Sequence, residues 1–239
     1  MKTMKLVTVF LMAGMFACIT KPDGLALVGG GLLDTTQLLL IDDSIILLRG
    51  EFVRVSGHRS VTPLPAAAEK VDMKGRVVCP MPSTIDESQM DAPALTMEKF
   101  LEQVTNRRPL IVGVPMDSSA WERSILALMR AQRLVIAPQL WKIKPGADLE
   151  RAKKNTKILL DEEIRIIVFP GAAAEQEMAL LSTAGLDNKQ LVRAYLQNSS
   201  LAAGSNASLL VLLGNPLDSW RNLFKVERKM ILGKWQAGA

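Results

Sequence analysis

Short apolar runs separated by turn signals fill the N-terminal part of the chain. The runs are rich in Leu, Ile and Val, and two of the interruptions are Gly29-Gly30-Gly31 and Asp42-Asp43-Ser44. This pattern is typical of short strands joined by turns. We expect an all-β segment with strands at Leu25–Val28, Gln37–Ile41, Ile45–Leu48, Phe52–Val55, Glu69–Asp72 and Arg76–Cys79.

After Pro80 the periodicity becomes that of helices alternating with buried strands. A capping box at Ser119–Glu122 precedes a helix whose apolar face would be Trp121, Ile125, Leu128 and Met129. Asp187, with Gln190 three residues later, predicts the cap of another helix. The remaining expected elements are helices at Met97–Val104, Ala147–Leu160, Glu175–Thr183 and Asn188–Gln197 and strands at Leu110–Val114, Leu134–Ala137 and Ile164–Phe169. Such alternation predicts a parallel α/β arrangement.

The C-terminal part returns to a β pattern, with strands expected at Ser208–Leu213 and Val226–Leu232. The order along the chain is therefore β, α/β, β. We predict a composite β domain made from residues 24–79 and 207–235, with an α/β domain of residues 80–206 inserted into it.

The first eighteen residues have the features of an export signal. Two lysines precede an apolar stretch from Leu6 to Phe16, which is shorter than the ~20 residues that span a bilayer. Met15-Phe16-Ala17-Cys18 resembles a bacterial lipobox, which predicts lipid attachment at Cys18 and an outer-membrane lipoprotein facing the periplasm. Ordinary cleavage near Ala17 and an uncleaved anchor are the alternatives.

Charge and cysteine content narrow the possible functions. The formal net charge of +5 falls to +3 without the two lysines of the signal segment, and no basic cluster remains to bind nucleic acid. If Cys18 carries lipid, Cys79 has no disulfide partner, and its apolar surroundings predict a core residue. Nothing places it beside His58, the chain's one histidine, so we reject a Cys–His catalytic pair.

Five phrases, in the right order, resemble the amidohydrolase superfamily, especially its imidazolonepropionase-like and prolidase-like members. Residues 25–33 are similar to its first strand, 49–57 to its "dGrIvavG" hairpin and 71–78 to its "vDakGkvv" turn. Residues 155–185 are similar to its last barrel strand and the following "hEL…aGL" helix, and 207–217 to its "ADLVVLdgNPL" segment. The resemblance implies a (β/α) barrel inserted in a β-sandwich, and hydrolysis by zinc or another divalent metal.

The metal ligands that the resemblance implies are replaced in this sequence. Ser88 and Met90 stand where the first pair of histidines belongs, and Gly171 stands where the aspartate of the last barrel strand belongs. Gln176 replaces the histidine of the "hEL" phrase, although Glu177 and Met178 fit it. We therefore expect no metal, no cofactor and no catalytic residue of the family type.

The remaining carboxylates have structural explanations that we favour over a site for a hard cation. Glu175 and Glu177 suit the first turn of a helix, and Asp117 suits a cap. Asp86 and Glu87 suit a polar loop after a strand, and Asp91 is the remaining candidate carboxylate.

The inserted domain is also short for a barrel. Residues 80–206 number 127, whereas a closed eight-stranded barrel needs ~200 or more. We expect a truncated TIM-barrel-like unit within a small β-sandwich. Its open edges would favour a homodimer or a protein partner.

Three functional hypotheses follow. The first is a non-catalytic, membrane-tethered binding protein of amidohydrolase-like fold. The second is a hydrolase that cleaves carbon–nitrogen bonds by an altered route, with Ser88, Ser118 or Ser199 as nucleophile, although no histidine is placed to activate them. The third is a decayed gene product, which would unfold without cooperativity.

Overall fold

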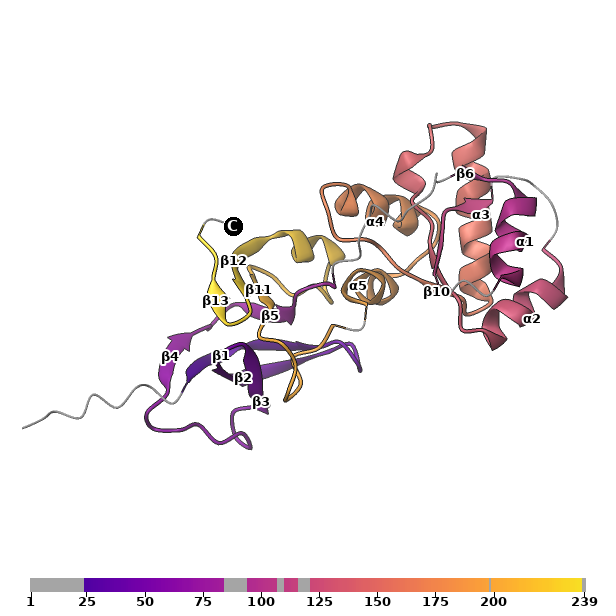
Figure 1. Ribbon diagram of the computed structural model, residues 1–239. Coiled ribbons are helices and arrows are strands. Elements are labelled where there is room, and N and C mark those ends of the chain that lie inside the picture. The colour runs from indigo at the N-terminus through magenta and orange to yellow at the C-terminus, as the bar shows by residue number, and fades with distance from the viewer. Residues whose placement is uncertain (1–23, 84–93, 107–109, 116–120, 198, 238–239) are drawn as a thin grey trace, which may run out of the picture.

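The computed structural model describes residues 24–83, 94–106, 110–115, 121–197 and 199–237. The chain forms a β part and an α/β part that lie side by side in an elongated molecule (Figure 1). Within the described residues there are five α-helices, and none is long and apolar enough to cross a membrane. The mixed α/β class is as predicted.

Strands from both ends of the chain make one eight-stranded sheet. Its main path runs β13-β12-β11-β5-β1-β2-β3, and β4 pairs in parallel with β1. The strands are β1 (Leu25–Asp34), β2 (Leu39–Arg49), β3 (Phe52–His58), β4 (Glu69–Asp72), β5 (Val77–Pro80), β11 (Leu209–Leu212), β12 (Val226–Ile231) and β13 (Lys234–Trp235). The antiparallel pair β5–β11 joins the N-terminal strands to the C-terminal ones.

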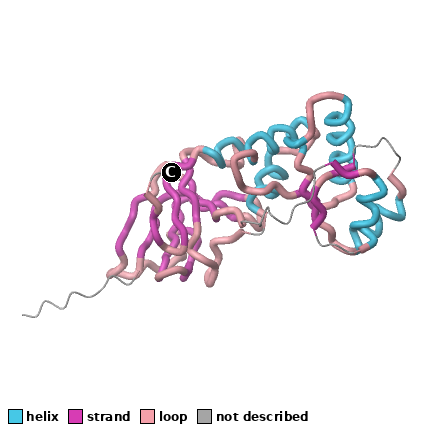
Figure 2. The backbone as a smooth tube through the Cα atoms, turned by 45° about the horizontal axis from the view of Figure 1, so that its top comes forward, coloured by secondary structure: helices cyan, strands magenta, loops and turns pink. Residues whose placement is uncertain are grey.

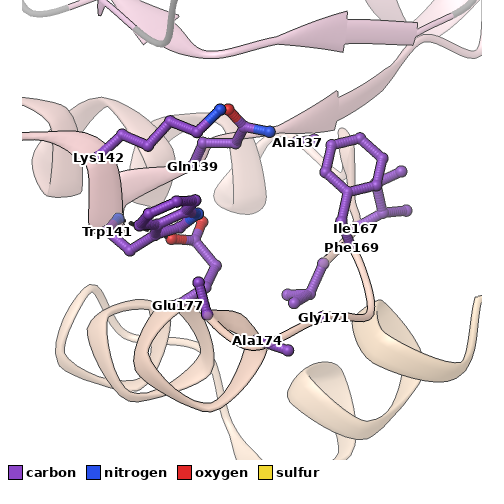
Figure 3. A pocket seen from close by; sticks show the side chains of 11 residues that line it. Ala137, Gln139, Trp141, Lys142, Ile167, Phe169, Gly171, Ala174 and Glu177 are labelled. Atoms are coloured by element: carbon purple, nitrogen blue, oxygen red, sulfur yellow. Dashed lines mark hydrogen bonds between the residues drawn. The ribbon is translucent and has the colours of Figure 1, made fainter. Parts of the chain in front are cut away.

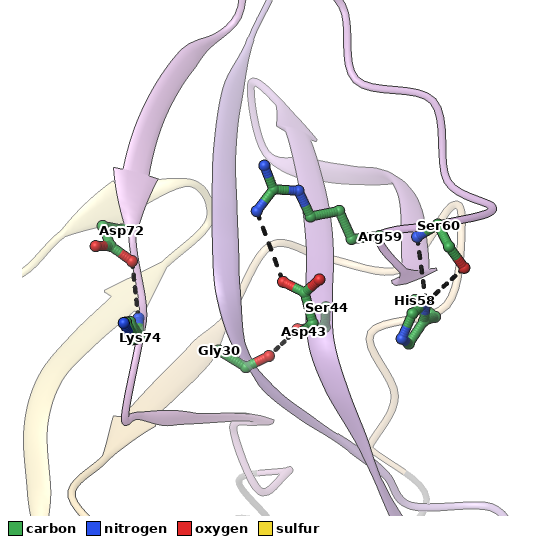
Figure 4. A network of polar contacts seen from close by, with 8 residues as sticks. All are labelled: Gly30, Asp43, Ser44, His58, Arg59, Ser60, Asp72 and Lys74. Atoms are coloured by element: carbon green, nitrogen blue, oxygen red, sulfur yellow. Dashed lines mark hydrogen bonds and ion pairs between the residues drawn. The ribbon is translucent and has the colours of Figure 1, made fainter.

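The glycine-rich and Asp-rich segments near residues 30 and 43 are bulges inside long strands, so the turns predicted there are wrong. The β1–β2 register shifts around Gly30, where the hydroxyl of Ser44 donates to the Gly30 carbonyl at 2.8 Å (Figure 4). A Cβ at Gly30 would lie 2.7 Å from the Cβ of Met73, so only glycine fits there. Asp43 has a φ of 42°, which lets β2 continue through the irregularity.

Main-chain hydrogen bonds also connect β3 to the segment that leads into β11. Val53 N–H donates to the Ser205 carbonyl at 2.9 Å, and Ala207 N–H donates to the Glu51 carbonyl at 2.7 Å. The curled sheet encloses a buried apolar cluster to which N-terminal strands contribute Leu27 and Ile46, and to which β11 contributes Leu209 and Val211. Neither end of the chain could bury these side chains alone.

The α/β part contains two small parallel sheets. One has the order β10-β9-β7 and the other pairs β6 with β8. The strands are β6 (Ala94–Leu95), β7 (Leu110–Val112), β8 (Val114–Pro115), β9 (Val135–Ala137) and β10 (Arg165–Ile166). The helices are α1 (Met97–Thr105), α2 (Arg123–Ala131), α3 (Ala147–Asp161), α4 (Ala174–Thr183) and α5 (Asn188–Leu196). Figure 2 shows the helices gathered in this part, away from the long strands.

The helix ends test the predicted caps. Asp187 accepts from Gln190 N–H at 2.7 Å and Gln190 returns the bond, which confirms the capping box of α5. The capping box at Ser119 is wrong for α2, because that helix begins at Arg123 and Glu122 is its N-cap. Its buried face is Leu126 and Met129, whereas the predicted Leu128 is 40% exposed.

Candidate functional site

A small pocket lies where the parallel strands β9 and β10 end. In open α/β sheets, ligands bind beyond the carboxyl ends of the strands, because the loops there converge. The chain after β9 and the chain after β10 form two walls, and α4 forms the floor (Figure 3). The central lining residues are Gln139, Trp141, Lys142, Phe169, Gly171 and Glu177.

Glu177 is the buried charged group of this pocket. It lies in the first turns of α4 and is 4% exposed. Its Oε2 accepts from Trp141 N–H at 3.0 Å, in the 3₁₀ turn η2 (Leu140–Lys142) that follows β9. Burial raises the pKa of Glu177 to about 7, although bonds from the main chain at residues 139–141 oppose the shift.

The pocket can hold a group of only a few atoms. The space open to water-sized molecules is about 30 Å³, which is room for one or two waters. Trp141 stands 38% exposed, with Lys142 Nζ 5.4 Å from the centre of its ring. A carboxyl group on one side and an ammonium group on the other could bind a small polar ligand, or one end of a larger one.

The structure describes two of the four positions where we expected a metal ligand to be replaced, Gly171 and Gln176. Gly171 lines the pocket but brings no side chain to it. Gln176 is exposed and absent from the pocket lining. Ser88 and Met90, like Cys18, lie outside the described residues.

A zinc ion needs about four nitrogen, sulfur or oxygen donors around one point. Of the family-type positions in the pocket, only Glu177 offers a charged oxygen, and Trp141 N–H already binds its Oε2. Among the described residues no three His, Cys, Asp or Glu side chains gather closely enough to hold a metal. The described residues of this pocket therefore do not supply the donor set that such a metal needs.

The two carboxylates predicted to serve the first turn of α4 differ in role. Glu175 is exposed, as that explanation requires, whereas Glu177 is buried and holds a neighbouring turn. Their positions in the first turn of the helix do not tell which of the two is buried. The one sequence signal for Glu177 was its match to the "hEL" phrase of the family. The other candidate carboxylates lie outside the described residues: Asp86, Glu87, Asp91 and Asp117.

Ser199, the candidate nucleophile that the structure describes, is not among the residues that line the pocket. The Ser199 hydroxyl lies 3.2 Å from that of Ser83, a second hydroxyl rather than a base. Ser88 and Ser118 lie outside the described residues. Cys79 is fully buried, which confirms it as a core residue, and burial raises its pKa to about 12. His58 is exposed and its Nδ1 lies 2.7 Å from the Ser60 hydroxyl (Figure 4).

Comparison with known proteins identifies the fold. No model of a known protein family matches the chain, and no curated protein sequence does either. Solved structures do match it. A putative prolidase from Bifidobacterium longum has 14% identity over 91% of this chain and 95% of that chain, with a TM-score of 0.64.

Three further structures agree with that match. Molinate hydrolase has 8% identity over 90% of this chain and 95% of that chain, with a TM-score of 0.66. The ochratoxinase of A. niger has 10% identity over 90% and 96% of the two chains, with a TM-score of 0.62. The crystal structure of an amidohydrolase also matches, with 10% identity and a TM-score of 0.62. The chain therefore has an amidohydrolase-like fold.

Proposed function

We propose that this protein is a non-catalytic relative of the amidohydrolases, exported and held at a bacterial membrane by lipid on Cys18. It acts by binding a ligand or a protein rather than by hydrolysis. In this proposal residues 80–206 are a shortened barrel inserted into the β domain of residues 24–79 and 207–235. The outer membrane, on its periplasmic side, is the proposed location.

The observation that carries the proposal is the chemistry of the pocket at the ends of β9 and β10. At this position the family outline calls for an aspartate, and Gly171 stands there. The remaining carboxylate, Glu177, accepts a hydrogen bond from the main chain of η2. Together these two residues do not supply the ligands that would hold a metal-bound water, and the described residues offer no other donor set for it.

The test is hydrolysis of amide, lactam and dipeptide substrates by the purified protein, supplied with zinc. We expect rates equal to those of buffer containing the same zinc. The Glu177→Gln variant is the matched control, since it keeps the shape of the pocket and removes its buried carboxylate. Hydrolysis by the wild type that this variant abolishes would overturn the proposal.

A hydrolase with an altered site is the alternative, and Ser199 is its one described nucleophile. The Ser199 hydroxyl lies 3.2 Å from the Ser83 hydroxyl, which cannot serve as a strong base. A serine-directed phosphonate probe should leave Ser199 unlabelled. Labelling that disappears in Ser199→Ala and persists in Ser83→Ala would favour the hydrolase.

The shortened barrel also motivates a protein partner. The three-stranded sheet ends at β10 and β7, and strand edges without partners tend to recruit other chains. We propose a homodimer or a partner protein that covers this part. Light scattering on the purified protein should give twice the mass of one chain if the partner is a second copy.

A further inference from the structure

One end of the eight-stranded sheet brings together three segments that are distant in sequence. Leu25 pairs with Leu48, so residue 24, where the described chain begins, lies beside the β2–β3 turn. Ala207 N–H donates to the Glu51 carbonyl at 2.7 Å, and Gly233 N–H donates to the Ala207 carbonyl at 2.8 Å. The β12–β13 turn therefore meets the β2–β3 turn at this same end.

Two large apolar side chains are exposed at these turns. Phe52 is 50% exposed and Leu232 is 39% exposed. They flank the contact between the turns, because Phe52 forms a bridge with Asn206 and Leu232 N–H donates to the Ser208 hydroxyl at 3.1 Å. Exposed apolar groups gathered at one end of a sheet indicate a contact surface.

The residue type at position 232 is not explained by the turn itself. Leu232 and Gly233 have φ values of 47° and 74°, the pattern of a two-residue turn that favours Asn-Gly. A leucine in this left-handed conformation is strained and also exposes its side chain to water. Asparagine would stabilise this turn better than leucine does. The leucine therefore indicates a contact with something outside the folded chain.

Chain length limits how far this end can lie from a membrane. Cys18 precedes Gly24 by six residues, and a fully extended chain spans ~20 Å over that length. If Cys18 carries lipid, which is part of the proposed function, the end of the sheet that holds Gly24 stays within ~20 Å of the bilayer. The other end of the long strands has no such restraint.

We propose that this end of the sheet rests on the lipid surface, with Phe52 and Leu232 inserted among the headgroups and upper acyl chains. The exposed charges around them carry both signs with a small basic excess: Arg49, Arg54, Lys70 and Lys234 are basic, and Glu51 and Glu69 are acidic. The contact is therefore mainly apolar and depends little on salt or on anionic lipid. Helices α1–α3 lie on the far side of the molecule from β4 and β13 (Figures 1 and 2), so the α/β part projects away from the membrane.

A polarity-sensitive dye attached to single cysteines tests this orientation in the full, exported chain. The two label sites are Leu232→Cys and, as matched control, Leu213→Cys. Leu213 is also an exposed leucine, at 56%, but it follows β11 at the opposite end of the β11–β12 pair. Cys79 is fully buried and should not react.

The labelled proteins are reconstituted into phosphatidylcholine vesicles with and without phosphatidylglycerol, and nitroxide-bearing lipid is added as quencher. We expect a blue shift and several-fold stronger quenching at position 232 than at 213, unchanged by salt. Equal quenching at the two positions, in a protein that stays with the vesicles, would overturn the orientation and leave the tether standing. If mass spectrometry finds Cys18 unmodified and the protein dissociates from the vesicles, the lipid anchor on Cys18 is wrong. The proposed orientation is then wrong with it.

A stability measurement separates membrane contact from a folding role of the leucine. Leu232→Asn should keep or raise the urea midpoint of unfolding, because asparagine tolerates the left-handed conformation. A large drop in the midpoint would mean that Leu232 serves the fold, and would contradict the inference.

Discussion

Glu177 shows how one buried side chain can connect two elements and set a pH response. The Glu177 side chain extends from α4, and its carboxylate accepts a hydrogen bond from Trp141 N–H in the turn after β9. This bond fixes η2 against the floor of the pocket, and it leaves the carboxylate in a site with little water. A carboxyl group held in such surroundings binds its proton more tightly than it does in the unfolded chain.

Glu177 should therefore make stability depend on pH. Its pKa is about 7 in the folded protein and 4.5 without the fold. The stabilising effect of protonation is complete below about pH 4.5 and is lost as pH rises through about 7. A pKa shift of this size corresponds to roughly 3 kcal/mol of unfolding free energy. The urea concentration at the midpoint of unfolding should therefore decrease as the pH rises from 5 to 8.

Glu177→Gln should remove this fall, because the amide stays neutral and can still accept from Trp141 N–H. The matched control is Glu175→Gln, because Glu175 is exposed on the same turn of α4. The urea midpoint of this variant should change with pH as that of the wild type does. An unchanged pH profile in Glu177→Gln would show that another group causes the response.

At the scale of elements, the sequence predicted most helices and strands to within a few residues. Hydrophobic periodicity located α1, α3, α4 and α5, and side-chain chemistry located the cap at Asp187. The errors arose where tertiary contacts decide. Gly30 permits close approach of Met73, so a segment that reads as a turn continues as a strand. The β12–β13 hairpin was also missed, because β13 has only two residues.

The caps of α5 and α2 provide a paired prediction. Asp187→Ala removes a side-chain bond to Gln190 N–H and should cost about 1 kcal/mol of unfolding free energy. Glu122, the N-cap of α2, makes no side-chain cap bond, so Glu122→Ala should be nearly neutral. Denaturant unfolding of both variants measures the difference. Equal losses would mean that the α5 capping box adds nothing to stability.

At the scale of the whole molecule, both ends of the chain share one hydrophobic core. Leu209 on β11 is fully buried with Leu27 and Ile46 from the N-terminal strands. Leu209→Ala should therefore cost about 2–5 kcal/mol. Leu213→Ala, which removes an exposed leucine just after the same strand, should change stability by less than about 0.5 kcal/mol. Similar losses in the two variants would contradict the shared core.

The sequence predicted the fold at this scale better than the site. The order β, α/β, β and the family phrases anticipated the amidohydrolase-like fold, because strand order follows from the pattern along the chain. The pocket was not predicted, since its walls come from loops after β9 and β10 and depend on packing. The expectation that Gly171 stands in place of the aspartate comes from the sequence alone and remains a prediction.

Metal content tests the central claim most directly. The full protein would be purified, offered zinc, passed through a desalting column and measured by elemental analysis, with its urea unfolding recorded in parallel. We predict no stoichiometric metal in a protein that still unfolds cooperatively, as a stable scaffold without metal should. One or two tightly bound zinc ions per chain would contradict the account and make hydrolysis the first function to test.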